Sequence, residues 1–246
     1  MPVKRRRLAA LAAGLFIATA HAGPPFLTDD PEPVGRGHAE INLIAQGTRT
    51  GAGRSGSFQA ELNLGCAHET QCHVALPVAA DRPVGGPTQT GLGDAEVGAK
   101  LRFLDRPDDG WSAAVYPTLF LPTGDAHRGL GNGRAQLLLP LWVQRSVGAW
   151  SLDVGTSLLV NPAPAARNSW YTGLLAQRSF GDRLSVGAEV FHRGSLAVGE
   201  PASSGFNVGA IVNVAARQNL LLSLGRGLTN VDANRGSIFL AYQLEQ

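Results

Sequence analysis

Apolar and polar residues alternate along much of this chain, and the alternation is clearest in GDAEVGAKLRFL at 93–104. The odd positions from Ala95 to Phe103 are all apolar, whereas the even positions are charged residues or glycine. Successive side chains of a β-strand point to opposite faces of its sheet, so this pattern predicts a strand between an apolar and an aqueous phase. The apolar phase is a protein core in a soluble protein and lipid in a membrane barrel.

Segments of this kind recur from one end of the chain to the other. They predict about twelve strands, at 38–47, 57–65, 72–78, 93–104, 111–121, 134–144, 150–160, 170–179, 184–192, 206–214, 219–225 and 237–244. Their lengths suit tilted crossings of a membrane. No later stretch approaches the roughly 18 consecutive apolar residues that a spanning helix needs.

The connections between these segments alternate in length. The long ones are 48–56, 79–92, 122–133, 161–169, 193–205 and 226–236, and the short ones are 66–71, 105–110, 145–149, 180–183 and 215–218. An even number of strands with long loops at one end and tight turns at the other is typical of an up-and-down outer-membrane β-barrel. A Greek-key sandwich has no reason to alternate in this way.

Aromatic residues gather near the ends of the predicted strands, at Trp111, Trp150, Trp170, Tyr171, Phe206 and Tyr242. Rings at these positions are typical of the girdles that lie at headgroup depth in a membrane barrel. The sequence therefore predicts an all-β fold, an antiparallel transmembrane barrel of about twelve strands.

The first residues read MPVKRRRLAALAAGLFIATAHA. A basic run at 4–7, an apolar run at 8–18 and the small residues of an A-x-A site at 20–22 predict a secretory signal peptide cleaved after Ala22. Residues 23–37 are rich in Pro and Asp and unsuited to regular strand pairing, so they form a lead-in folded against the barrel or inside it. The barrel itself is expected at 38–246.

Charge argues against a nucleic-acid partner. The chain has 21 Lys and Arg, but removing the four in the signal peptide leaves 17 against 19 Asp and Glu. The mature chain is thus slightly acidic, and it lacks the basic surface of a nucleic-acid binder.

The two cysteines, Cys66 and Cys72, stand close together in an exported chain, which favours a disulfide. The neighbouring residues His68, Glu69 and His73 invite a zinc reading, but the spacing of a tetrahedral site is absent. We therefore expect neither a metal nor a cofactor.

Several stretches identify a family resemblance. PPFLTDDPEPV near the mature start, GLGDAEVGAKLRFL, LPTGD and RGLGNGRAQLLLPLWVQRS resemble the bacterial outer-membrane transporters named for the meta-cleavage pathway of phenol degradation. Later stretches, such as LSVGAEVFHR and GFNVGAIVNVAARQNLLLSLGRGL, are similar to the same family. The resemblance implies an outer-membrane β-barrel that transports small molecules, aromatic or hydrophobic ones among them, and it brings no catalytic residues.

With the apolar faces toward lipid, the opposite parity points charged side chains into the lumen. These lumen-lining candidates are Glu40, Glu61, Asp94, Glu96, Lys100, Arg102, Arg134, Asp153 and Glu189. They either line a polar path for a solute or pair with one another as charges in a narrow barrel do.

The most distinctive connection is PTGDAHRGLGNGR, whose Asp125, His127, Arg128 and Asn132 are candidates for a role at the extracellular mouth. They either converge there, as an inward-folded constriction, or belong to an ordinary glycine-rich surface loop.

We expect a pore or facilitator for small molecules in the outer membrane, with membrane lipid and a small solute as its partners. One alternative is a structural barrel that conducts nothing. The other is a barrel hydrolase using His192, Ser195 and Glu189, or His127 with Asp125, but the chain has no G-x-S-x-G motif and we predict that it is not an enzyme.

Overall fold

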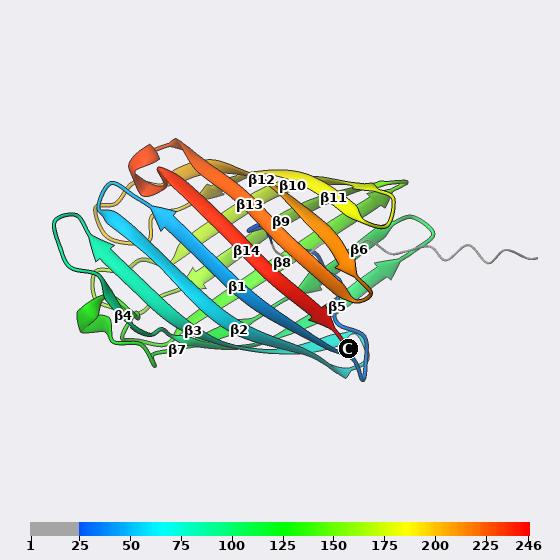
Figure 1. Cartoon of the computed structure of the whole chain (residues 1–246), viewed down its shortest axis with the longest axis horizontal. Helices are drawn as coiled ribbons and strands as arrows, with labels where there is room; N and C mark the ends of the chain where they lie inside the picture. Colours follow the sequence, from blue (N-terminus) through cyan, green and yellow to red (C-terminus); the bar gives the residue numbers. More distant parts are fainter. Residues whose placement is uncertain (1–24) are drawn as a thin grey trace, which may run out of the picture.

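The computed structural model of the chain describes residues 25–246 as one antiparallel barrel (Figure 1). The expected signal peptide, 1–22, lies outside the described residues. Among the described residues no helix is long and apolar enough to cross a membrane.

Each crossing of the barrel pairs with the crossings before and after it in the chain, and the last strand returns to the first. The strands are β1 (Ala39–Arg49), β2 (Gly53–Ala67), β3 (Thr70–Pro83), β4 (Gln89–Leu92), β5 (Ala95–Arg106), β6 (Trp111–Val115), β7 (Thr118–Leu121), β8 (Gln136–Val147), β9 (Trp150–Val160), β10 (Ser169–Phe180), β11 (Leu184–Arg193), β12 (Ser203–Ala215), β13 (Gln218–Thr229) and β14 (Gly236–Glu245). Pairing of β1 with β14, from Glu40 opposite Glu245 to Arg49 opposite Gly236, closes the barrel. Closure leaves no sheet edge with unpaired backbone groups, as lipid surroundings require.

The fourteen strand segments make twelve crossings, which confirms the predicted fold class. β4 and β5 both pair with β3 and are separated only by Gly93 and Asp94. β6 and β7 both pair with β5 and with β8, and Tyr116 and Pro117 interrupt them. Proline has no N–H to donate to the ladder, which explains why the strand is broken there.

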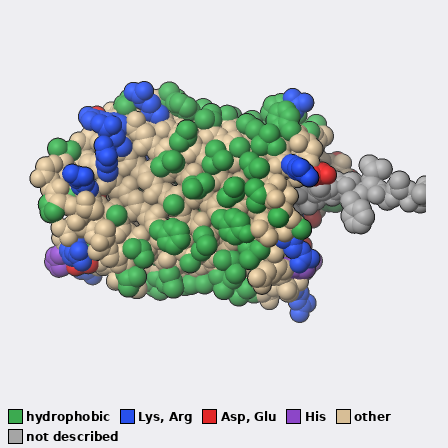
Figure 2. Space-filling model, in the orientation of Figure 1, with side chains coloured by type: hydrophobic (Ala, Val, Ile, Leu, Met, Phe, Trp, Pro, Cys, Tyr) green, Lys and Arg blue, Asp and Glu red, His purple; other side chains and the backbone are tan. Residues whose placement is uncertain are grey.

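The apolar faces point outward, and the polar faces point into the lumen. On the outside, Leu76 and Phe103 are 63% and 64% exposed, whereas the inward-facing Lys100 and Asp153 are 5% and 0% exposed. Apolar side chains form a band around the middle of the molecule (Figure 2). A contiguous apolar band of this size needs lipid around it. The fold therefore agrees with the location in the outer membrane that the sequence predicts.

Several strands are longer than the alternation predicts. The connection expected at 48–56 is reduced to residues 50–52, because β1 continues to Arg49 and β2 begins at Gly53. Likewise β3 extends to Pro83, beyond the predicted 72–78. These extensions lie beyond the bulky apolar band, where the residues are mostly small or polar and the alternation disappears.

Most of the predicted girdle residues face outward, but Tyr171 does not. Trp150 and Trp170 are 47% and 59% exposed on the outer face, whereas Tyr171 is 8% exposed and points into the lumen. The prediction for Tyr171 is wrong because it follows Trp170 directly, so its side chain must take the opposite face.

The two ends of the barrel differ. The C-terminus and the tight turns lie at one end, and the 3-10 helices η1 (Ala126–Arg128) and η2 (Val231–Ala233) lie in connections at the other (Figure 1). Outer-membrane barrels place short turns in the periplasm and long loops outside the cell. We call the two ends periplasmic and extracellular on this basis.

Candidate functional site: the occupied lumen

The lead-in runs inside the barrel instead of beside it. Its residues Phe26, Thr28 and Asp30 are 8%, 1% and 4% exposed, although the segment contains no helix or strand of its own. The side chains that bury these residues belong to the inward faces of the surrounding strands. The lumen is therefore closed at this level by a segment that precedes the first strand.

Glu189 of β11 holds the segment near its start. The Leu27 and Thr28 backbone N–H groups donate to its carboxylate over 3.1 and 2.6 Å. The Tyr171 hydroxyl and the Asn207 side-chain amide also donate to it, each over 2.7 Å. Glu189 is 1% exposed, and its four donors are all neutral. Four hydrogen bonds therefore converge on one buried side chain, which makes this a firm attachment.

Glycines in the barrel wall make room for the same segment. A Cβ at Gly187 would lie 2.7 Å from Phe26 Cζ, and a Cβ at Gly173 would lie 2.1 Å from Thr28 Oγ1. Each pairs across the sheet with another glycine, Gly209 and Gly155 respectively. The space at Gly187 and Gly173 is thus filled by the lead-in and not by solvent, whereas the Trp142 ring fills the space at Gly155.

Lys100 of β5 forms a second attachment. Its Nζ lies 2.9 Å from Asp29 Oδ2 and 3.6 Å from Asp30 Oδ1, and it donates to the Glu32 backbone carbonyl over 3.4 Å. Burial raises the pKa of the Asp30 carboxyl, and the Lys100 ammonium opposes that rise. The lead-in therefore supplies two carboxylates to a buried cation, in a cavity that Glu40, Glu61 and Glu96 also line.

Arg102, two residues further along β5, fixes the place where the segment leaves the lumen. Its guanidinium contacts the Glu32 and Glu69 carboxylates, and Asp105 Oδ2 lies 3.3 Å away. The hydrogen bond from Arg102 lowers the pKa of the Glu69 carboxyl, which belongs to the turn between β2 and β3. One arginine thus ties the lead-in to this turn.

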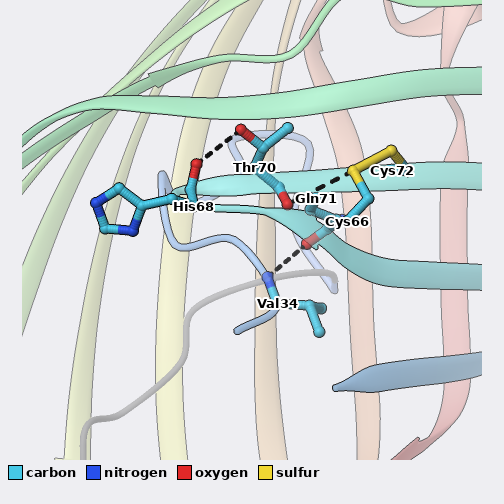
Figure 3. Close-up of a disulfide and its surroundings, with 6 residues drawn as sticks. All are labelled: Val34, Cys66, His68, Thr70, Gln71 and Cys72. Carbon is cyan, nitrogen blue, oxygen red and sulfur yellow. Dashed lines mark hydrogen bonds between the residues drawn. A yellow bond between two sulfur atoms is a disulfide. The ribbon is translucent and has the colours of Figure 1, made fainter. Parts of the chain in front are cut away.

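The same turn carries the disulfide between Cys66 and Cys72 (Figure 3). Beside it, Gln71 points inward, and its side-chain Oε1 accepts a 2.9 Å hydrogen bond from the Val34 backbone N–H. No group of three or more metal-ligating side chains occurs within residues 25–246.

Glu40 and Glu61 form an acidic pair in the lumen. The Asn42 and Asn63 amides each donate to both carboxylates over 2.8 to 3.0 Å. His73 extends this network, because its Nδ1 lies 2.9 Å from Asn63 Oδ1.

Glu96 and Asp153 make separate contacts in the lumen. Glu96 Oε2 is 3.7 Å from His73 Nε2. On the opposite wall, Asp153 accepts from Gln144 over 2.7 Å and from Ser151 over 3.0 Å.

Two of the lumen-lining candidates lie elsewhere. Asp94 sits between β4 and β5, where its carboxylate accepts from the Gly124 and Asn132 backbone N–H groups over 2.9 and 2.7 Å. Arg134 is exposed in the loop that precedes β8. Asp94 therefore organises the extracellular loop that follows β7, and Arg134 belongs to that loop.

The remaining candidates in this loop contact its surroundings at the rim. Asp125 caps η1 by accepting from the His127 backbone N–H, and Arg128 donates to the Gln89 side chain and to a carbonyl of β4. Asn132 exchanges hydrogen bonds with Asn161 of the next loop. Residues 123–134 line neither of the cavities described next.

The lead-in separates two cavities in the lumen. The cavity on the periplasmic side has a volume of about 650 Å³ and is lined by Glu40, Glu61, Glu96 and Lys100 among others. The cavity on the extracellular side has a volume of about 1370 Å³. Phe26 lines both, so this single residue marks the boundary between them.

The hydrolase candidates do not assemble into a catalytic group. Glu189 is buried under the lead-in, while His192 is exposed, with its Nδ1 2.9 Å from Ser204 Oγ. Ser195 donates its hydroxyl hydrogen to the Glu200 backbone carbonyl. A nucleophile, a base and an orienting group within hydrogen-bond reach are therefore not found at these residues.

Sequence reasoning overlooked Tyr171, Asn207 and the lead-in residues that bind Glu189. The inward polar residues of β10 and β12 carry no charge, so they were not among the charged residues predicted to line the lumen. One signal was present in the sequence: Lys100 occupies an inward position of its strand, and the lead-in carries Asp29 and Asp30. A buried cation needs an acidic partner, and the lead-in was an available source.

Comparison with known proteins adds a family and a fold. Residues 72–244 match the family described as "Putative MetA-pathway of phenol degradation". None of the curated proteins matches the sequence.

Among solved structures, an outer-membrane channel from Pseudomonas putida F1 is similar with a TM-score of 0.73 and 17% identity, covering 88% of this chain and 98% of that one. The KdgM porin is similar with a TM-score of 0.59 and 10% identity, covering 83% and 98%. The translocator domain of the autotransporter NalP from Neisseria meningitidis has a TM-score of 0.52 and 12% identity, covering 85% and 87%. These likenesses concern the barrel fold. The family match spans most of the chain, and the chain belongs to the phenol-degradation MetA-pathway family.

Proposed function

We propose that the protein is a gated pore for small molecules, in which the lead-in is the gate. The observation that carries this proposal is the position of residues 25–36 between the two cavities of one lumen. A solute that enters the extracellular cavity meets Phe26 and the segment clamped to Glu189. Passage to the periplasm requires that segment to move aside.

The attachments of the lead-in suit a segment that moves. Within residues 25–35 they are hydrogen bonds and ion pairs, and none of these is a strand pairing within the barrel ladder. Arg36, where the segment leaves the lumen, forms an isolated parallel bridge with Gly65 of β2. Breaking the hydrogen bonds and ion pairs therefore leaves the barrel closed and intact, because its strands hold each other. Similarity in fold to proteins named as a channel and a porin supports the same role.

The extracellular cavity favours aromatic solutes. Phe26, Phe191 and Phe239 line it together with Leu27 and Arg193. Aromatic rings prefer to pack on other rings, and a cation among them attracts acidic substituents. The name of the family agrees with small aromatic compounds as the substrate class.

The test is uptake of a solute that does not cross bilayers unaided, such as benzenesulfonate, into vesicles carrying the purified barrel. We expect wild-type vesicles to take it up faster than vesicles without protein. The Glu189→Gln variant should be faster still, by several-fold, because an amide cannot accept from four donors at once. Asp153→Asn is the control, since Asp153 accepts hydrogen bonds only from Gln144 and Ser151 of the wall. Its charge repels Asp29 and Asp30 of the lead-in, so its neutralisation should not raise uptake.

Two results would contradict this proposal. If neither the wild type nor Glu189→Gln exceeded protein-free vesicles, the non-conducting barrel would be the better account. If Asp153→Asn raised uptake as much as Glu189→Gln, the effect would come from loosening of the wall and not from the lead-in.

A further inference from the structure

Three arginines stand side by side on the outer surface near the extracellular end. Arg49 of β1 lies opposite Arg54 of β2, and Arg54 lies opposite Arg82 of β3. All three side chains are exposed. They lie on the same face of the sheet as the outward-pointing Phe58, because Phe58 is four positions, an even offset, after Arg54 in β2. Figure 2 shows Lys and Arg side chains gathered at this end, beyond the apolar band.

Within the described chain, these arginines have no acidic side chain within 4 Å. Asp81 is next to Arg82 but takes the opposite face of β3. Arg235, by contrast, pairs with Asp232 over 2.7 Å. Like charges directly opposite one another destabilise a sheet. Anions supplied from outside the chain would offset the repulsion within this row of three adjacent arginines.

A fourth arginine extends the row on its other side. Gly236 of β14 lies opposite Arg49. On β13, Gly225 pairs with Ser237, and the next residue is the exposed Arg226. The cross-strand row therefore reads arginine, glycine, arginine, arginine, arginine, and the glycine leaves a gap between two guanidinium groups.

The depth of the row matches lipid headgroups. Phe58 lies four positions after Arg54 and pairs with Ala45 and Val78 in the last bulky apolar row of β1 to β3. At about 3.4 Å per residue and a strand tilt of roughly 40°, the arginines lie about 10 Å further out. On β1 to β3 the row between them consists of small residues, Gly47, Gly56 and Ala80, whereas on β14 and β13 the same row holds the exposed Ile238 and Leu224. The small residues leave a strip of the wall without bulky side chains just below Arg49, Arg54 and Arg82.

The periplasmic end is built differently. There the Arg145 guanidinium lies 5.1 Å from the Trp111 ring, and the Arg178 guanidinium lies 5.4 Å from the Trp150 ring. Those arginines form cation–π interactions with neighbouring aromatic rings. The outer row has arginine next to arginine and no ring between them, so it is suited to a ligand with several negative charges.

We propose that this row, Arg49, Arg54, Arg82 and Arg226, binds the phosphate groups of lipopolysaccharide in the outer leaflet. A guanidinium donates two parallel hydrogen bonds to a phosphate, which makes arginine well suited to such a ligand. The phosphates neutralise the adjacent charges, and the sugars and upper acyl chains lie over the strip of small residues. This site is independent of the lead-in and of solute passage.

The test compares the heat stability of the folded barrel in detergent with and without lipopolysaccharide, read from gel mobility before and after heating. We expect lipopolysaccharide to raise the unfolding temperature of the wild type. The R49Q/R54Q/R82Q variant should lose this rise and weaken apparent binding on the order of a hundredfold. Without lipopolysaccharide the same variant should be at least as heat-stable as the wild type, because the repulsion is gone.

Matched controls separate this site from general effects of charge. R106Q/R145Q/R178Q removes three exposed arginines from the periplasmic end and should keep the full rise. Lipopolysaccharide stripped of its phosphates, or phosphatidylglycerol in its place, should give little or no rise. An equal rise with either lipid, or an unchanged rise in the R49Q/R54Q/R82Q variant, would overturn the proposal.

Discussion

At the scale of single residues, small side chains in the wall decide what the lumen contains. Phe26 and Thr28 of the lead-in fit only because Gly187 and Gly173 have no Cβ. A methyl group at Gly187 would lie 2.7 and 2.9 Å from two atoms of the Phe26 ring, closer than side-chain carbons approach. Gly187 is therefore part of the wall surface on which the Phe26 ring of the lead-in packs.

A single substitution tests this contact between the wall and the lead-in. We predict that Gly187→Ala displaces the lead-in, so that a cysteine replacing Thr28, which is 1% exposed, reacts with a water-soluble thiol reagent. The two native cysteines form a disulfide and do not react. Gly47→Ala is the control, because its Cβ would meet neighbours only at ordinary distances of 3.6 and 3.7 Å. Equal labelling in both variants would contradict the claim that Gly187 positions the lead-in.

At the scale of elements, the turn between β2 and β3 holds the lead-in where it leaves the lumen. Arg102 joins Glu69 of this turn to Glu32 of the lead-in, and Gln71 binds the Val34 backbone N–H. Because Arg102 lowers the pKa of the Glu69 carboxyl, this attachment depends on pH. The stability that it gives is complete above the ordinary pKa of about 4.5 and is lost as the pH falls through the lowered value.

We therefore predict that Glu69→Gln reduces the stability of the barrel near pH 6 and has little effect near pH 3. The expected difference is at most about 1 kcal/mol, since Glu69 is largely solvated. The measurement is the midpoint of urea unfolding of both proteins at the two pH values. Glu200→Gln, at the opposite end of the barrel, should show no such difference. A loss of the same size at both pH values would indicate a role for Glu69 other than its charge.

At the scale of the whole molecule, the barrel was predictable from the sequence and its contents were not. Alternation along strands such as 93–104 is a local property, and it fixes which residues face lipid. The position of the lead-in depends on contacts such as those between Thr28 and Glu189, which are 161 residues apart. No local pattern in residues 23–37 marks them as the partner of particular wall residues.

For the candidate site residues, too, the inward position was predictable from the sequence and the partners were not. Glu189, Lys100 and Arg102 were identified by parity alone, but their common task of holding one segment appears only in three dimensions. Asp94 has the parity of a lumen residue and instead binds loop backbone, because the strand is interrupted between Leu92 and Ala95. The arginine row was missed because its residues are adjacent across strands and distant in sequence.

The most direct test of the gated pore is the conductance of single barrels in a planar bilayer. The wild type is compared with a variant in which residues 25–34 are replaced by a glycine- and serine-rich segment of equal length. That variant keeps all the strands but lacks the Phe26 ring, which packs against Gly187, and the Asp29 and Asp30 carboxylates, which pair with Lys100. We predict a small conductance for the wild type and a several-fold larger, stable conductance for the variant. Equal conductance of the two proteins would contradict the claim that the lead-in closes the pore.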